Sequence, residues 1–97
     1  MSENEINKNW DNIVNKTRED STKYFLEYAV NKQIDHNCLK SFLLFYCLKL
    51  EIPCISDEDV DYIMKFYTSG GLTLNFDQFV EVVESLNVIK YLEPQNQ

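Results

Sequence analysis

The chain has 97 residues, of which 44% are hydrophobic and 13% aromatic, and it contains only 2 glycines and 2 prolines. A chain of this length favours one domain, and this composition opposes disorder and favours a compact helical fold. The formal net charge of -7 opposes binding to the phosphate backbone of nucleic acids and favours a basic helix as the partner. No apolar run approaches the roughly 20 residues of a membrane-spanning helix, so we expect no membrane insertion.

The residues that commonly carry chemistry are few. The three cysteines, Cys38, Cys47 and Cys54, form no CxxC motif, and the single histidine, His36, cannot complete a zinc site. An odd number of cysteines without a signal peptide predicts reduced thiols in the cytoplasm. There is no glycine-rich phosphate-binding loop and no nucleophile beside His36, so we expect no catalytic residue and no enzymatic activity.

A helical pattern of apolar residues begins at Ile6 and includes Trp10. A polar stretch then interrupts the pattern, and Asp20 or Ser21 can cap a new helix there. We therefore expect residues 1–20 to form a helical extension that is separate from the next helix. Trp10 is expected either to be buried against the rest of the domain or to mark a contact surface.

The next predicted helix ends near Val30, and after a short loop another spans Asn37–Leu50, capped by Asp35 or Asn37. The helix over Asn37–Leu50 is apolar nearly all round, so it must be covered on more than one side. Part of this cover can come from the N-terminal extension and part from another protein.

The stretch Ser56–Leu86 predicts two further helices around a loop that contains two glycines. Ser56 followed by Asp59 has the spacing of a capping box, and Asn75 with Gln78 can cap the last helix. The loop between them contains the alternating segment Leu-Thr-Leu, which suits a very short strand. The two inner faces are predicted to comprise Val60, Ile63, Met64, Tyr67, Phe79, Val82, Val83 and Leu86.

Two short amphipathic helices around a loop with a central strand residue resemble an EF-hand. The earlier half of the chain repeats this order, and aligning Ile34 with Leu74 also aligns Leu39 with Phe79. The resemblance implies an all-α fold with one EF-hand lobe, in which Ile34 and Leu74 form a very short antiparallel β pair between the loops. The two helix-loop-helix units would span residues 21–50 and 56–92, with an extra N-terminal helix before them and a tail over 93–97.

The loops lack the ligands that the resemblance requires for calcium. An EF-hand binds calcium through several oxygen ligands in a loop of roughly twelve residues that a bidentate Glu closes. The second loop would begin at Thr68 and end at the neutral Gln78. In the first loop Lys32 and Gln33 lie where ligands would be, and Cys38 takes the closing position, where a thiol is a poor calcium ligand. We therefore expect no metal site and no cofactor.

EF-hand proteins with degenerate loops are often constitutive subunits, and this chain resembles the small single-lobe light chains of unconventional myosins. The resemblance implies a calcium-independent light chain that binds a basic amphipathic helix, the IQ motif, of a myosin heavy chain. Such a protein would be cytoplasmic and associated with the cytoskeleton.

Binding a helix in a groove requires an apolar trough with a rim of opposite charge. The trough is expected to be lined by Leu43, Tyr46, Cys47, Ile63, Tyr67, Val82, Val83 and Leu86. The acidic rim is expected to comprise Glu51, Asp57, Glu58, Asp61, Glu81 and Glu84. The alternative for each apolar residue is a place in the ordinary core, and for each acid a solvated surface position.

Two other interpretations stay open. The chain can be an EF-hand-like adaptor or a homodimeric interaction module that uses the same surface for another helical partner or for a second copy. It can also be an unrelated helical interaction domain whose loop only mimics an EF-hand, and an antiparallel contact between Ile34 and Leu74 would argue against that alternative.

Overall fold

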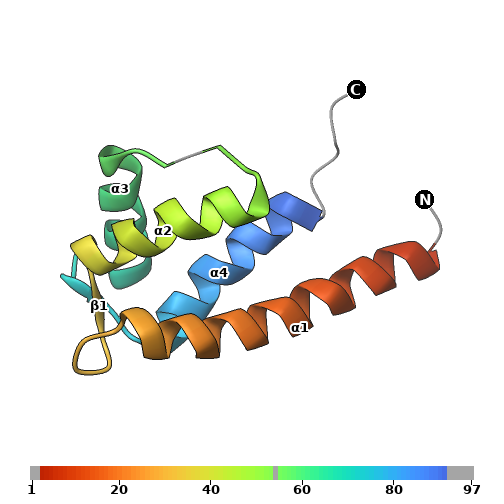
Figure 1. Ribbon diagram of the computed structural model, residues 1–97, viewed down its shortest axis with the longest axis horizontal. Coiled ribbons are helices and arrows are strands. Elements are labelled where there is room, and N and C mark those ends of the chain that lie inside the picture. Colours follow the sequence, from red (N-terminus) through yellow and green to blue (C-terminus); the bar gives the residue numbers. More distant parts are fainter. Residues whose placement is uncertain (1–2, 54, 92–97) are drawn as a thin grey trace.

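Figure 1 shows the computed structural model, which describes residues 3–53 and 55–91. Over these residues the fold is mostly helical, with four helices and a small two-stranded antiparallel sheet, as the sequence predicted at this level. The elements in chain order are α1 (Glu3–Tyr28), β1 (Ile34–Asp35), α2 (His36–Leu50), α3 (Asp57–Thr68), β2 (Thr73–Leu74) and α4 (Phe76–Tyr91). None of these helices is long and apolar enough to cross a membrane.

Helix α1 runs without a break through the polar stretch where the sequence predicted a new helix. The prediction of a separate N-terminal helix is therefore wrong. Asp20 and Ser21 are 5% and 0% exposed, so they lie on the packed face of α1 rather than at a helix start. The carboxylate of Asp20 accepts a hydrogen bond from the Tyr46 hydroxyl of α2 instead of capping a backbone N–H. Trp10 is 46% exposed, so of its two expected placements, burial against the rest of the domain is not found, and a place on a contact surface stays a prediction.

The other three helices begin with side chain–backbone hydrogen bonds at the residues that the sequence indicated. The Asp35 carboxylate accepts a 2.8 Å hydrogen bond from the backbone N–H three residues later. Ser56 and Asp59 form a reciprocal capping box at the start of α3. Asn75 and Gln78 do the same at the start of α4, at 2.8 and 2.9 Å. These bonds satisfy backbone donors that a helix start leaves without partners.

The two short strands join the loops of the two halves. Ile34 lies opposite Leu74 and Asp35 opposite Thr73, in an antiparallel pair. Ile34 and Leu74 are both fully buried, so the pair also places two aliphatic side chains in the core. The register is the one expected from the internal alignment.

An aromatic cluster fills the space between α1, α2 and α4. The Phe42 ring is stacked on that of Tyr46, with centroids 4.9 Å apart, and lies edge-on to Phe79 at 4.8 Å. Tyr24 of α1 contacts Phe42 at 5.7 Å, while α1 lies along α4 in the largest helix–helix contact of the fold. Such edge-to-face and offset contacts add to the stabilisation from burial.

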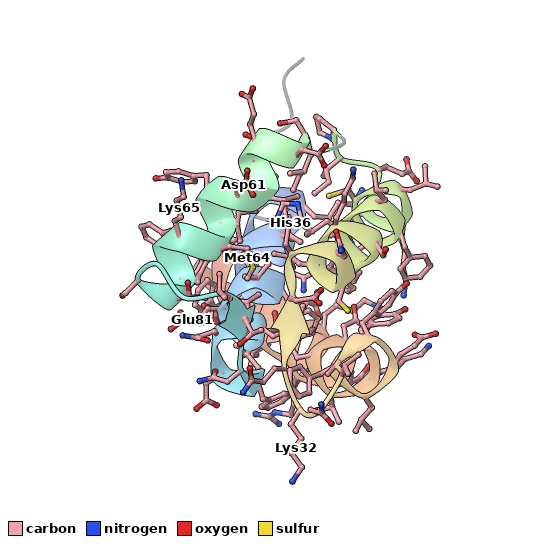
Figure 2. All side chains as sticks on the ribbon, turned by 90° about the vertical axis from the view of Figure 1, so that its left-hand side faces the viewer. Lys32, His36, Asp61, Met64, Lys65 and Glu81 are labelled. Carbon is pink, nitrogen blue, oxygen red and sulfur yellow. The ribbon has the colours of Figure 1, made fainter. Side chains whose placement is uncertain are left out.

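The Lys40–Asp57 ion pair and a contact between His36 and the Asp61 carboxylate connect the start of α2 with the start of α3. Lys40 Nζ lies 2.6 Å from the Asp57 carboxylate, and His36 Nδ1 lies 2.9 Å from that of Asp61. Figure 2 shows His36 and Asp61 close to one another between the two helices. Because both pairs are partly exposed, each adds little to stability, but together they hold the first turns of α2 and α3 in one arrangement.

Candidate partner-binding surfaces

The residues predicted to line a trough lie together, but they form the interior of the lobe. All of those on α2 and α4 belong to the buried core and are at most 6% exposed; they are Leu43, Tyr46, Cys47, Val82, Val83 and Leu86. The two from α3, Ile63 and Tyr67, are half-buried and pack against this core. In this conformation the four helices close over the predicted trough, and only its α3 edge reaches the surface.

A buried polar network holds this closed arrangement across three helices. The Tyr46 hydroxyl donates to Asp20 at 2.6 Å, and Asn87 Nδ2 lies 3.1 Å from the same hydroxyl and 3.3 Å from Thr17 Oγ1. Burial, and then the neighbouring Asp20 carboxylate, raise the pKa of the Tyr46 phenol, so it stays a donor. Lys16, one turn before Asp20, lies 3.7 Å from its carboxylate.

This network was not expected from the sequence. Its signal was the position of polar residues on apolar helix faces: Thr17 lies one turn after the buried Ile13, and Asn87 one turn after Val83. A polar residue at such a position requires a buried partner, because an unpaired buried polar group is costly.

All six residues of the predicted acidic rim are exposed: Glu51, Asp57, Glu58, Asp61, Glu81 and Glu84. Two of them already have basic partners on α2, because Asp57 pairs with Lys40 and Asp61 with His36. The hydrogen bond from Lys40 lowers the pKa of Asp57. The closed trough has no open rim, so the acids lie on the outer surface of the lobe.

The polar groups of the second loop bond to the ends of the helices beside it. Gln78 Nε2 donates to the Tyr67 carbonyl at 2.9 Å, while its Oε1 accepts from the Asn75 N–H at 2.8 Å. One carboxamide therefore joins the end of α3 to the start of α4. The Thr68 hydroxyl lies within hydrogen-bonding distance of two carbonyl oxygens, those of Met64 and Gly71.

The first loop closes in a different way. Asn31 and Lys32 both have positive φ values, 54° and 64°, and Val30 and Gln33 form a bridge around them. This is the backbone pattern of a tight hairpin turn. The hydrogen bond from the Cys38 N–H lowers the pKa of Asp35, so this carboxylate stays charged as a helix cap. Over residues 3–53 and 55–91, no group of three or more His, Cys, Asp or Glu side chains is placed to hold a metal ion.

Helix α2 keeps an apolar face in contact with solvent. Its inner face is covered by α1, α3 and α4, but Leu44, Phe45 and Leu48 remain 47%, 42% and 74% exposed. The prediction that this helix needs cover on more than one side is thus met only in part by α1, through contacts such as Tyr24 with Phe45 at 5.4 Å.

Helix α3 has a second exposed apolar face, which the sequence analysis did not identify. Tyr62 and Phe66 are 67% and 64% exposed, and their rings are stacked with centroids 6.1 Å apart. Phe66 also lies edge-on to Tyr67 at 5.0 Å. The sequence feature that indicates this face is a pair of aromatic residues four positions apart, which places them on the same side of a helix. Both residues lie outside the apolar face that was predicted to point into the core.

A groove of about 410 Å³ lies along the seam between α1 and α4. Its lining is mixed, with Val14, Thr17, Arg18, Ser21, Thr22, Phe76, Asp77, Val80 and Glu84. The Ser21 hydroxyl is buried beside it and has no hydrogen-bond partner in the described part of the chain. The lining combines one cation, two carboxylates and apolar side chains, so it favours no single class of ligand.

The chain matches no protein-family model, and comparisons with curated proteins and with solved structures find no match. The function must therefore be argued from the residues and their geometry.

Proposed function

We propose that this protein is a non-catalytic, calcium-independent light chain that binds a basic amphipathic helix, the IQ motif of an unconventional myosin heavy chain. The proposal treats its two helix-loop-helix halves as degenerate EF-hands. It is supported by the antiparallel pair of Ile34 with Leu74, which couples the two loops back to back.

The single observation that carries the proposal is the position of Gln78. In an EF-hand a carboxylate at the end of the loop binds the ion, and the ion connects the loop to the outgoing helix. Here the Gln78 carboxamide makes that connection by itself, because it bonds to both Tyr67 and Asn75. A loop closed by its own side chain keeps its shape without calcium, as a permanently bound subunit requires.

The surface charge favours a basic partner. The chain has 16 acidic and 9 Lys or Arg residues, and the six acids named above are exposed. Complementary charge of this kind accelerates association and orients the partner, while apolar contacts supply most of the affinity. If the partner helix entered the predicted trough, the lobe would first have to open and expose core residues such as Leu43 and Val83.

The proposal is tested by co-purification from the native cell in the presence of a chelator. We expect a myosin heavy chain to be retained under these conditions, because neither loop depends on calcium. A direct test is titration of the purified chain with a synthetic IQ-motif peptide, with and without chelator. Recovery of only unrelated proteins together with no binding of the peptide would contradict the proposal.

The exposed face of Leu44, Phe45 and Leu48 favours a second candidate, a homodimeric or adaptor module. Contiguous exposed apolar side chains often mark protein–protein contacts. Sedimentation equilibrium separates the two candidates. A stable dimer that does not bind IQ-motif peptides would favour self-association, whereas a monomer that binds them would favour the light chain.

A further inference from the structure

The outer face of α3 is an aromatic surface that the described residues leave mostly exposed. Tyr62 and Phe66 lie one helical turn apart, are both mostly exposed and contact each other. Exposed aromatic side chains in contact form a rigid apolar surface, and residues of this kind are enriched among those that dominate binding energy.

This surface is continuous with the edge of the closed trough. Phe66 contacts Tyr67, whose hydroxyl lies 2.9 Å from the Ser85 hydroxyl of α4. Ile63 lies one turn before Tyr67, and Ile89, 44% exposed, lies one turn after Ser85. The two trough residues that the structure leaves half-buried, Ile63 and Tyr67, are therefore neighbours of the aromatic pair.

Charge distinguishes this face from the exposed face of α2. The first turn of α3 contains three acids, Asp57, Glu58 and Asp59, and Asp61 follows in the next turn. The helix contains one basic residue, Lys65, so its net charge is negative. Figure 2 shows Asp61 and Lys65 on α3. Glu81 belongs to α4 and lies near the end of α3 that leads into the second loop.

The apolar residues of α2 are flanked differently. Helical spacing places Asn37 and Ser41, which are uncharged, on the same face as Leu44 and Leu48. The charged residues at helical spacing from these leucines are Lys40, one turn before Leu44, and Glu51, the C-cap residue three positions after Leu48. The α3 face thus carries more acidic charge than the α2 face, which favours α3 as the docking surface for a basic partner.

We propose that the closed lobe binds the basic amphipathic helix on the α3 face formed by Tyr62 and Phe66, continued by Ile63 and Tyr67, and not in the trough. This inference rests on the proposed light-chain function and names the surface that performs it. The apolar side of the partner helix packs on the two aromatic rings. Its Lys or Arg side chains reach Glu58, the acid of the first α3 turn that has no partner among the described residues, and a cation over the Tyr62 or Phe66 ring adds a further attraction.

Binding at this face leaves the core closed. The Tyr46–Asp20 bond, the Lys40–Asp57 ion pair and the His36–Asp61 contact stay intact, so no opening transition precedes association. The two binding modes thus differ in the side chains that they require: exposed ones on α3 for the outer face, and buried ones on α2 and α4 for the trough.

The test measures affinity for a synthetic IQ-motif peptide by titration calorimetry. The variant Y62S/F66S is compared with L44S/L48S, which removes two exposed apolar side chains from α2 instead. We expect Y62S/F66S to weaken binding at least about tenfold and L44S/L48S to bind like wild type, because binding energy concentrates in buried aromatic contacts. Thermal unfolding of both variants checks that the fold is kept.

A second variant, E58Q/E81Q, removes charge without changing shape. We expect it to slow association and to weaken the salt dependence of the association rate, while the melting temperature stays unchanged. If Y62S/F66S is less stable than wild type, the association rate of E58Q/E81Q decides whether the α3 face is the docking surface.

The outcomes separate the two proposals. No binding of the peptide by wild type contradicts the proposed function itself. Binding by wild type that Y62S/F66S and E58Q/E81Q leave unchanged overturns the α3 surface and leaves the light-chain function in place. A loss of binding in L44S/L48S alone also overturns it, because the docking face would then lie on α2.

Discussion

The hydroxyl of Tyr46 donates a 2.6 Å hydrogen bond to the Asp20 carboxylate, which joins the middle of α2 to a residue 26 positions earlier on α1. Both side chains are at least nine-tenths buried. A bond between two buried groups restricts how the two helices cross, because a displacement weakens a polar contact that water cannot easily replace. This explains why α1 continues through a stretch that is polar in sequence.

We expect Tyr46→Phe to lower the free energy of unfolding by about 1–3 kcal/mol, because the buried Asp20 carboxylate loses a donor. Urea denaturation followed by circular dichroism measures the change. Tyr62→Phe is the matched control: its hydroxyl is lost from an exposed ring, so the change should stay within about 0.5 kcal/mol. Equal stability of the two variants would show that the bond to Asp20 contributes nothing.

The continuity of α1 is tested by proline at Thr22. In a helix that began with Ser21 as its cap, residue 22 would be the first helical position, where proline is well tolerated. In the observed helix it lies in the interior, where proline costs about 3 kcal/mol or more.

We therefore expect Thr22→Pro to unfold the protein at much lower denaturant concentration, with a loss of helical circular dichroism. Thr22→Ala, which keeps the backbone N–H, serves as the control and should leave stability equal or slightly higher. Thr22→Pro with wild-type stability would support a helix boundary at this position.

The features that local sequence predicts are those that depend on few residues. The capping box of Ser56 and Asp59 and the cap of Asn75 and Gln78 involve side chains three positions apart, so their spacing suffices to place the start of a helix. The pairing of Ile34 with Leu74 followed from an internal repeat of the helix-loop-helix pattern.

The features that local sequence could not predict depend on long-range contacts. Asp20 marks a helix start only if its carboxylate accepts a hydrogen bond from a backbone N–H two or three residues later. Here the carboxylate accepts a hydrogen bond from Tyr46 of another helix. The angles between the helices decide whether Leu43 and Val83 line an open trough or fill a closed core. The apolar sequence pattern is the same for the open and the closed lobe. Apolar periodicity identifies an inner face but not whether the lobe is open.

The Asp35 cap predicts a pH dependence. Its pKa is lowered in the folded state, chiefly by the Cys38 N–H, so its stabilising effect is present above the unfolded pKa of about 3.9. The effect is lost as the pH falls through the lower folded value. Asp35→Asn caps about equally well at neutral pH but does not titrate.

We therefore expect wild type and Asp35→Asn to have similar stability at pH 7, and wild type to lose more stability than the variant as the pH falls below about 4. Asp35→Ala should cost about 1 kcal/mol at neutral pH, because the cap is lost. Parallel pH profiles of wild type and Asp35→Asn would contradict the assignment of the cap to the charged carboxylate.

The closure of the second loop by Gln78 predicts the effect of placing an acid at this position. Gln78→Glu keeps the acceptor for the Asn75 N–H but replaces the donor that faces the Tyr67 carbonyl, so two oxygens would meet. We expect a loss of about 1–3 kcal/mol at neutral pH. The loss should diminish below pH 4, where a protonated Glu can donate. Gln78→Ala, which loses both bonds, is the control and should show no recovery at low pH.

Calcium should leave the melting temperature of the wild-type protein unchanged. A ligand that binds only the folded state raises this temperature, and the increase grows with the logarithm of its concentration relative to its Kd, so the measurement detects a site that is well occupied. Both loops are already closed by their own contacts, the second by Gln78 and the first by the turn between Val30 and Gln33. Thermal unfolding in chelator and at micromolar free calcium should therefore give the same curve. A higher melting temperature with calcium would show that a loop opens to bind the ion, and it would argue against a constitutive subunit.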